Sequence, residues 1–212
     1  MLTRAPATVA IAAVTALVGV LLLLGDMVGY AAVYAGFIPA RLGDTLPLLA
    51  QVDLMPVWLT PFSTTLVHAS FLHLGFNLMM LGYTGVATER AIGARGLVAL
   101  YLIAAVGAVA AHWAFKPNSA VPMIGASGAA SGVIGAYSVL YSRRDRARAI
   151  GPLSAGAVQM IWLVVAWSAI NLLIGFITAG TSMPIAGAAH VGGFIMGVVL
   201  ARPLVRWHWQ NA

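Results

Sequence analysis

The chain has 212 residues, of which 61% are hydrophobic and only 8% are charged, and its mean hydropathy is +0.96. Because a soluble domain carries about a quarter charged residues, this composition excludes a soluble globular protein and indicates a polytopic membrane protein. The net charge of +6 does not indicate nucleic-acid binding, since the basic residues lie in short segments between apolar runs. Without cysteine, the chain can form neither disulfides nor thiolate metal sites.

Six apolar runs follow one another along the chain, and we expect each to be a membrane-spanning helix of an all-α fold. A bilayer core of about 30 Å needs about 20 apolar residues per helix. The first run is longer than the apolar part of a signal peptide and no clear cleavage site follows it, so we expect a span there too. We expect one membrane domain over residues 1–212. The predicted spans are residues 7–25, 68–88, 97–114, 127–142, 158–177 and 187–205.

A longer segment, residues 30–66, separates the first two runs. Four prolines, two aspartates and one arginine interrupt its hydrophobicity. Irregular backbone cannot face lipid with its polar groups unsatisfied. We therefore expect a folded loop that lies in the membrane interface.

The basic residues predict the orientation of the chain. With the N-terminus in the cytosol, nine of them fall inside and only Arg41 and Lys116 fall outside, which is the usual positive-inside bias. Six spans then return the C-terminus to the cytosol. The composition and the lack of an organelle signal favour a bacterial inner membrane. The nine are Arg4, Arg90, Arg95, Arg143, Arg144, Arg146, Arg148, Arg202 and Arg206.

Polar side chains within apolar runs are costly and often functional, and four stand out. They are His73 and Asn77 of the second run, Ser127 at the start of the fourth and His190 of the sixth. Counted from the cytosolic charge that ends each run, at a rise of about 1.5 Å per residue, His73 and Ser127 lie at a height of about 24 Å. Asn77 and His190 lie at about 18 Å. Three helices thus place polar groups in one layer of the outer bilayer half, which predicts a single site.

This set of groups suits acyl transfer. A serine hydroxyl needs a nearby base to become a nucleophile, and His190 can be that base for Ser127. The anion formed on attack at a carbonyl needs hydrogen-bond donors, which His73 and Asn77 can supply from one helix face. Gly125 allows a substrate backbone to approach closely. Because no carboxylate lies in the layer to orient His190, we expect a Ser–His dyad and not a triad.

The motif IGASGAASG at residues 124–132 holds two serines, and their places in the helix distinguish them. Ser127 follows Pro122 and Gly125, so we expect the helix to begin there. Its backbone N–H then has no partner within the helix and can serve the oxyanion at the favourable end of the helix dipole. Ser131 lies one turn further, and its hydroxyl is expected to bond back to the Ser127 carbonyl. We therefore predict Ser127 as the nucleophile.

Small residues are expected to support the site by packing. Gly128 of the fourth run, and Gly193 and Gly197 of the sixth, follow the small-residue spacing that lets membrane helices approach closely. Close approach of these two helices would bring His190 within hydrogen-bond reach of Ser127.

Several motifs together resemble the signatures of rhomboid intramembrane serine proteases, and they occur in that family's order. The resemblance covers about residues 37–200 and implies a six-helix core whose short fourth helix starts at the nucleophile. The motifs are FIPARL (37–42), HASFLHLGFNLMMLG (68–82), ERAIG (89–93), GASG (125–128) and AHVGG (189–193).

The resemblance also implies residue roles. Ser127 and His190 correspond to the nucleophile and the base, and His73, Asn77 and the Ser127 N–H correspond to the oxyanion donors. His68 matches a further family histidine near a water-filled cavity. One departure is that Trp58 has no adjacent arginine, whereas well-known bacterial members carry a Trp-Arg pair in this loop.

Members of this family cut transmembrane substrates near the membrane surface without a metal or a cofactor. The implied partners are therefore single-span or multi-span membrane proteins and the lipid bilayer, with the active site opening to the outer side. The loop at residues 178–187 would be a mobile cap, and the fifth span would be a lateral gate.

Three other functions stay open. A rhomboid-like protein that binds membrane clients without cutting them usually lacks the serine or the base, and both are present here. A transporter or channel would show inverted repeats or paired broken helices, and the sequence has no internal repeat. A narrower alternative is a dedicated enzyme that trims one class of C-terminal sorting signals.

Overall fold

The computed structural model of this protein describes residues 5–43, 53–141, 148–178 and 185–210. In these ranges the chain is helical, and no strand occurs apart from two isolated bridge pairs. Four of the helices are long and apolar enough to cross a membrane, so the chain is an integral membrane protein. They are α1 (Pro6–Leu24), α4 (Phe71–Phe115), α6 (Ala155–Ile177) and α7 (Gly187–Gln210).

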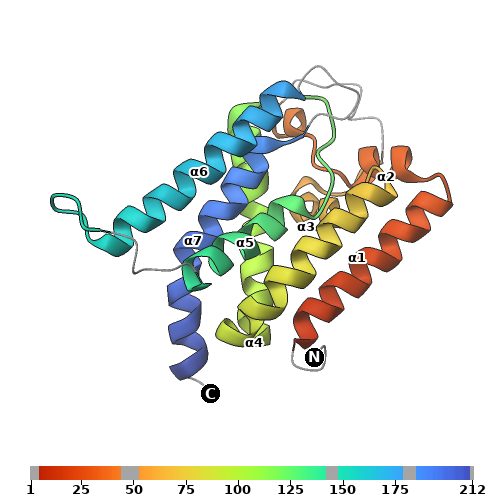
Figure 1. Cartoon of the computed structure of the whole chain (residues 1–212). Helices are drawn as coiled ribbons and strands as arrows, with labels where there is room; N and C mark the ends of the chain where they lie inside the picture. Colours follow the sequence, from red (N-terminus) through yellow and green to blue (C-terminus); the bar gives the residue numbers. More distant parts are fainter. Residues whose placement is uncertain (1–4, 44–52, 142–147, 179–184, 211–212) are drawn as a thin grey trace.

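The second and third predicted spans form one element. We expected a connection between residues 88 and 97, but α4 runs for 45 residues through this region and departs from helical geometry at Gly93, where φ is 74°. Glycine adopts this conformation without a steric penalty, so the chain turns within one residue and needs no loop. Figure 1 shows the two halves of α4 folding back from this bend. The ring of His208 from the end of α7 lies against Gly93.

The carboxylate of Glu89, just before this bend, holds the start of α1. It accepts hydrogen bonds from the backbone N–H groups of Ala7 and Thr8, at 2.9 and 2.7 Å, and from the Thr8 hydroxyl at 2.7 Å. N–H groups in the first turn of a helix lack partners within the helix, and the helix dipole favours negative charge there. Glu89 is buried and connects α1 to α4. From the sequence it is interpreted only as the charge that ends the second apolar run at the cytosolic side.

The central element is α5 (Ser127–Tyr141), which packs against both α4 and α7 (Figure 1). Its buried side chains include Ala129, Val133 and Ala136, all part of the main hydrophobic core. By contrast, α6 packs mainly against α7. Among the residues of α6, all of which the structure describes, Asn171 alone is buried.

The segment between α1 and α4 folds into short helical turns, and residues 44–52 of it lie outside the described ranges. The guanidinium Nη2 of Arg41 donates a hydrogen bond of 2.8 Å to the Met55 carbonyl and thereby joins the two described parts of the segment. The turns are α2 (Val28–Ala35), η2 (Pro39–Leu42), η4 (Val57–Leu59), α3 (Thr60–Ser63) and η5 (Thr64–Leu66).

Candidate active site

The two residues expected to start the chemistry lie in direct contact. Ser127 is the first residue of α5, and His190 lies in the first turn of α7. The His190 Nε2 and the Ser127 Oγ are 2.7 Å apart, which is a hydrogen bond across 63 positions of sequence. A hydroxyl in this contact can pass its proton to an imidazole nitrogen.

Close packing of α5 against α7 makes this contact possible. A Cβ atom on Gly193 would collide with the carbonyl oxygen of Gly128, and one on Gly197 would collide with the carbonyl oxygen of Gly132. The two helix backbones therefore approach each other without intervening side chains. Any larger residue at these positions would push His190 away from Ser127.

The chain enters α5 through a turn that only glycine adopts easily. Gly125 has a φ of +113°, in a region that side-chain-bearing residues rarely occupy. A Cβ atom there would stand 2.7 Å from the His73 ring and 3.7 Å from the Ser127 Oγ. The ring of His73 therefore lies beside the turn that precedes the serine.

The segment before Ser127 is held by residues from the connection between α1 and α4. Met123 and Phe37 exchange two backbone hydrogen bonds, of 2.8 and 3.1 Å. The Gly125 N–H donates to the Thr64 carbonyl at 2.9 Å. The predicted interfacial loop is thus the support on which the serine segment rests.

His68 completes this support. Its ring is fully buried, and its Nε2 accepts a hydrogen bond of 3.3 Å from the N–H of Ala126, the residue before the serine. Its Nδ1 lies 3.4 Å from the Leu66 carbonyl, and its ring meets the edge of His73 with centroids 5.1 Å apart. In this structure His68 holds backbone and a neighbouring ring.

Asn77 lies one turn below His73 on α4 and is also buried. Its Nδ2 donates a hydrogen bond of 2.9 Å to the carbonyl of His73, within its own helix. That bond uses one of the two N–H groups of the amide, and the other is available to a bound group.

The second serine of the motif takes the place that the sequence predicts. The Ser131 hydroxyl donates a hydrogen bond of 2.8 Å to the Ser127 carbonyl, and Ser131 is buried. The expected back-bond is confirmed.

One polar residue at this place was not predicted from the sequence. The Asn171 Oδ1 in α6 lies 2.8 Å from the His190 Nδ1, on the far side of the imidazole from Ser127. A sequence rule that admits only carboxylates as partners for the histidine overlooks this amide. Its presence within the apolar run 158–177 was the available signal.

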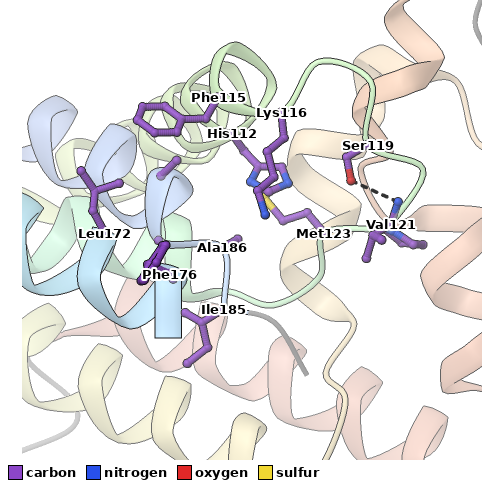
Figure 2. Close-up of a pocket in the computed structure, with 14 residues that line it drawn as sticks. His112, Phe115, Lys116, Ser119, Val121, Met123, Leu172, Phe176, Ile185 and Ala186 are labelled. Atoms are coloured by element: carbon purple, nitrogen blue, oxygen red, sulfur yellow. Dashed lines mark hydrogen bonds between the residues drawn. The ribbon is translucent and has the colours of Figure 1, made fainter. Parts of the chain in front are cut away.

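A cavity of about 400 Å³ lies where α4 and α6 end and α7 begins (Figure 2). Gly187 and Ala188, which line it, come just before His190 in the chain. Its wall is mostly apolar, with His112, Lys116 and Ser119 as polar exceptions, and Figure 2 shows His112 and Lys116 close together. Ile185 also lines the cavity, while residues 179–184 of the predicted cap lie outside the described residues.

Comparison with known proteins adds a family to this geometry. The model of the Rhomboid domain matches residues 55–207. The mitochondrial rhomboid protein 1 of Saccharomyces cerevisiae is 30% identical over 72% of this chain and 43% of its own length. The rhomboid protease GlpG of Pectobacterium atrosepticum is 33% identical over 66% of this chain and 46% of its own length. The rhomboid protease GluP of Bacillus subtilis is 32% identical over 74% of this chain and 27% of its own length. The chain therefore spans less than half the length of each of these relatives.

Proposed function

The chain belongs to the rhomboid family, and from this premise we propose that it is an intramembrane serine endopeptidase that cuts membrane-protein substrates. The observation that carries the proposal is the 2.7 Å contact between the Ser127 Oγ and the His190 Nε2 at the start of a buried helix. An isolated capping serine would not need a histidine delivered from another helix.

The proposed reaction has two steps. The Ser127 Oγ attacks the scissile carbonyl while its proton moves to the His190 Nε2, and the imidazolium then protonates the leaving amine, which yields an acyl-enzyme. Water next attacks the acyl-enzyme while one of its protons moves to the His190 Nε2. The bond between the acyl carbon and the Ser127 Oγ then breaks, the imidazolium returns its proton to the Oγ, and the second product leaves with a new carboxyl end. Ser127 supplies the nucleophile and His190 the proton carrier in both steps, and water supplies the second nucleophile.

We assign the oxyanion stabilisation to the Ser127 N–H, His73 and Asn77. The position of Ser127 at the helix start supports the first, because its N–H lies outside the helix ladder. The contact of His73 with Gly125 and the unused N–H of Asn77 support the other two. Hydrogen-bond donors that are already in place before the reaction lower the activation barrier most effectively where water is excluded from the site.

The same proposal extends to the architecture. We propose one rhomboid membrane domain with six spans, in which the two halves of α4 supply two and the 15-residue α5 is the short fourth. A helix of 15 residues is about 22 Å long, which is less than the bilayer core, so Ser127 would lie below the outer surface. The termini would be cytosolic, in a bacterial inner membrane, with substrates entering from the bilayer.

The test is cleavage of a tagged single-span substrate by purified protein in liposomes. We expect wild type to cut, Ser127→Ala and His190→Ala to lose all measurable cleavage, and Ser131→Ala to retain it as the matched serine control. A fluorophosphonate should label wild type and Ser131→Ala but not Ser127→Ala. Cleavage by Ser127→Ala at the wild-type rate would overturn the mechanism, and substrate binding without cleavage by wild type would favour the client-binding alternative.

A further inference from the structure

Two residues of α6, one helical turn apart, hold His190. The Trp167 Nε1 donates a hydrogen bond of 3.3 Å to the His190 carbonyl, and the Asn171 Oδ1 lies 2.8 Å from the His190 Nδ1. Asn171 is only 6% exposed although most of α6 faces outward. A buried amide on an otherwise exposed apolar helix is costly unless its hydrogen bonds are satisfied, and here both ends of the amide have partners.

The hydrogen bonds of Asn171 fix which way its amide points. Its Nδ2 donates to the Trp167 carbonyl at 2.9 Å. A carbonyl oxygen can only accept, so the NH₂ group must face Trp167 and the oxygen must face His190. The orientation of the amide thus follows from chemistry and not from the shape of the side chain alone.

The orientation of the amide in turn fixes the proton on the imidazole. The Asn171 oxygen can only accept, so the His190 Nδ1 must carry a hydrogen. In the neutral ring the Nε2 is then an unprotonated acceptor, and this is the atom that lies 2.7 Å from the Ser127 Oγ. A general base for serine needs this tautomer and no other.

We infer that Asn171 is a positioning residue that holds His190 in the Nδ1–H tautomer with its Nε2 aimed at Ser127. This inference rests on the proposed function and extends the expected Ser–His dyad to a Ser–His–Asn arrangement. When the Ser127 proton reaches the Nε2, the ring becomes an imidazolium, and its Nδ1–H bond to the Asn171 oxygen becomes charge-assisted and stronger. The orienting third group of such a site can be an amide as well as a carboxylate.

The test compares three variants. Asn171→Leu keeps the volume and removes the acceptor, Asn171→Asp keeps an acceptor oxygen, and Thr84→Val is the control. Thr84 is a buried residue of α4 whose hydroxyl donates to a carbonyl one turn back, as the Asn171 amide does, but it has no part in the site. We expect kcat to fall about 10- to 100-fold in Asn171→Leu at unchanged KM, the range for a hydrogen bond to a group that becomes charged. Asn171→Asp should recover most of this loss, and Thr84→Val should cut at the wild-type rate.

A second readout does not depend on turnover. Nitrogen-15 NMR of histidine-labelled protein distinguishes the two imidazole tautomers, with His190→Gln to assign the signal. Wild type should show the Nδ1–H form alone, and Asn171→Leu should show a mixture. A wild-type rate together with an unchanged tautomer in Asn171→Leu would overturn the inference and leave the proposed function standing. Failure of wild type to cut any substrate would instead sink the proposed function, and the tautomer spectra would still decide the role of Asn171.

Discussion

Two serines with the same following residue have different surroundings in this protein. Ser127 and Ser131 each precede a glycine, but the Ser127 hydroxyl meets an imidazole and the Ser131 hydroxyl meets a backbone carbonyl. The difference comes from helix position. The first residue of a helix has no helical carbonyl one turn before it, whereas a residue one turn later has a carbonyl of its own helix within reach.

At the scale of single residues, Gly125→Ala tests how closely His73 and the serine turn are fitted together. A methyl group there would enter the space of the His73 ring, on a backbone at φ +113°. We expect kcat to fall about 10- to 100-fold, because relief of this clash displaces the His73 ring from the serine turn and misplacement of about 1 Å can cost about 100-fold in rate. The control is Gly75→Ala in α4, where a Cβ would meet no atom within 4 Å. Equal cleavage rates for the two variants would show that the turn is not part of the site.

Most polar residues of the candidate site can be predicted from the sequence, because each one interrupts an apolar run. This rule identifies His73, Asn77, Ser127 and His190, and the structure joins two of them in a hydrogen bond. Their catalytic roles stay predictions. Asn171 obeys the same rule, but its role depends on which way an amide points, and only the hydrogen bond to the Trp167 carbonyl reveals that.

At the scale of elements, one carboxylate connects α1 to the bend of α4. Glu89 accepts three hydrogen bonds from the first turn of α1, across more than 80 positions of sequence. Hydrogen bonds to a carboxylate are stronger than bonds between neutral groups. Removal of the buried Glu89 side chain would leave three donors of α1 without a partner. Packing of α1 therefore depends on this side chain.

We expect Glu89→Ala to lower the free energy of unfolding by about 3 kcal/mol or more, since it strips the partners from buried donors. Thermal unfolding in detergent measures the effect. The control is Asp26→Asn just beyond the other end of α1, an exposed residue with φ 52° that asparagine tolerates equally well. A melting temperature of Glu89→Ala equal to that of the control would contradict this role.

The length of the apolar runs predicts the helices better than it predicts what joins them. The first run, expected at 7–25, is the helix Pro6–Leu24. The segment ERAIGARG, expected as a connection because of its charges, is helical, since Glu89 is satisfied inside the fold and one glycine makes the turn. Such pairing between distant residues leaves no trace in a local sequence pattern.

At the scale of the whole molecule, contacts between distant segments gather at two opposite ends of the helix bundle. The start of α1, the bend of α4 and the end of α7 meet at one end, through Glu89 and His208 (Figure 1). The segments around Phe37 and Met123 meet at the other. Of the basic residues, Arg90 and Arg95 flank the bend, while Arg41 and Lys116 belong to the opposite segments. The Arg4 and Arg143–Arg146 positions of the charge count lie outside the described residues.

This arrangement makes the proposed orientation testable, because the chain has no cysteine of its own. We expect Lys116→Cys to react with a membrane-impermeant maleimide in intact cells, and Arg206→Cys to react only after permeabilisation, as the positive-inside bias requires. Both residues are exposed. The unmodified protein provides the background, and the reverse labelling pattern would invert the proposed topology.

The hydrogen bonds that build the candidate site join residues far apart in the chain: Ala126 to His68 across 58 positions, and Ser127 to His190 across 63. Helices need only local bonds and form early, whereas contacts of long sequence separation form late. A newly inserted chain therefore acquires its helices before it acquires the hydrogen bond between Ser127 and His190. If the proposed function holds, the enzyme is inactive while it folds. It can cleave neighbouring membrane proteins only after α7, the last helix, has packed against α5.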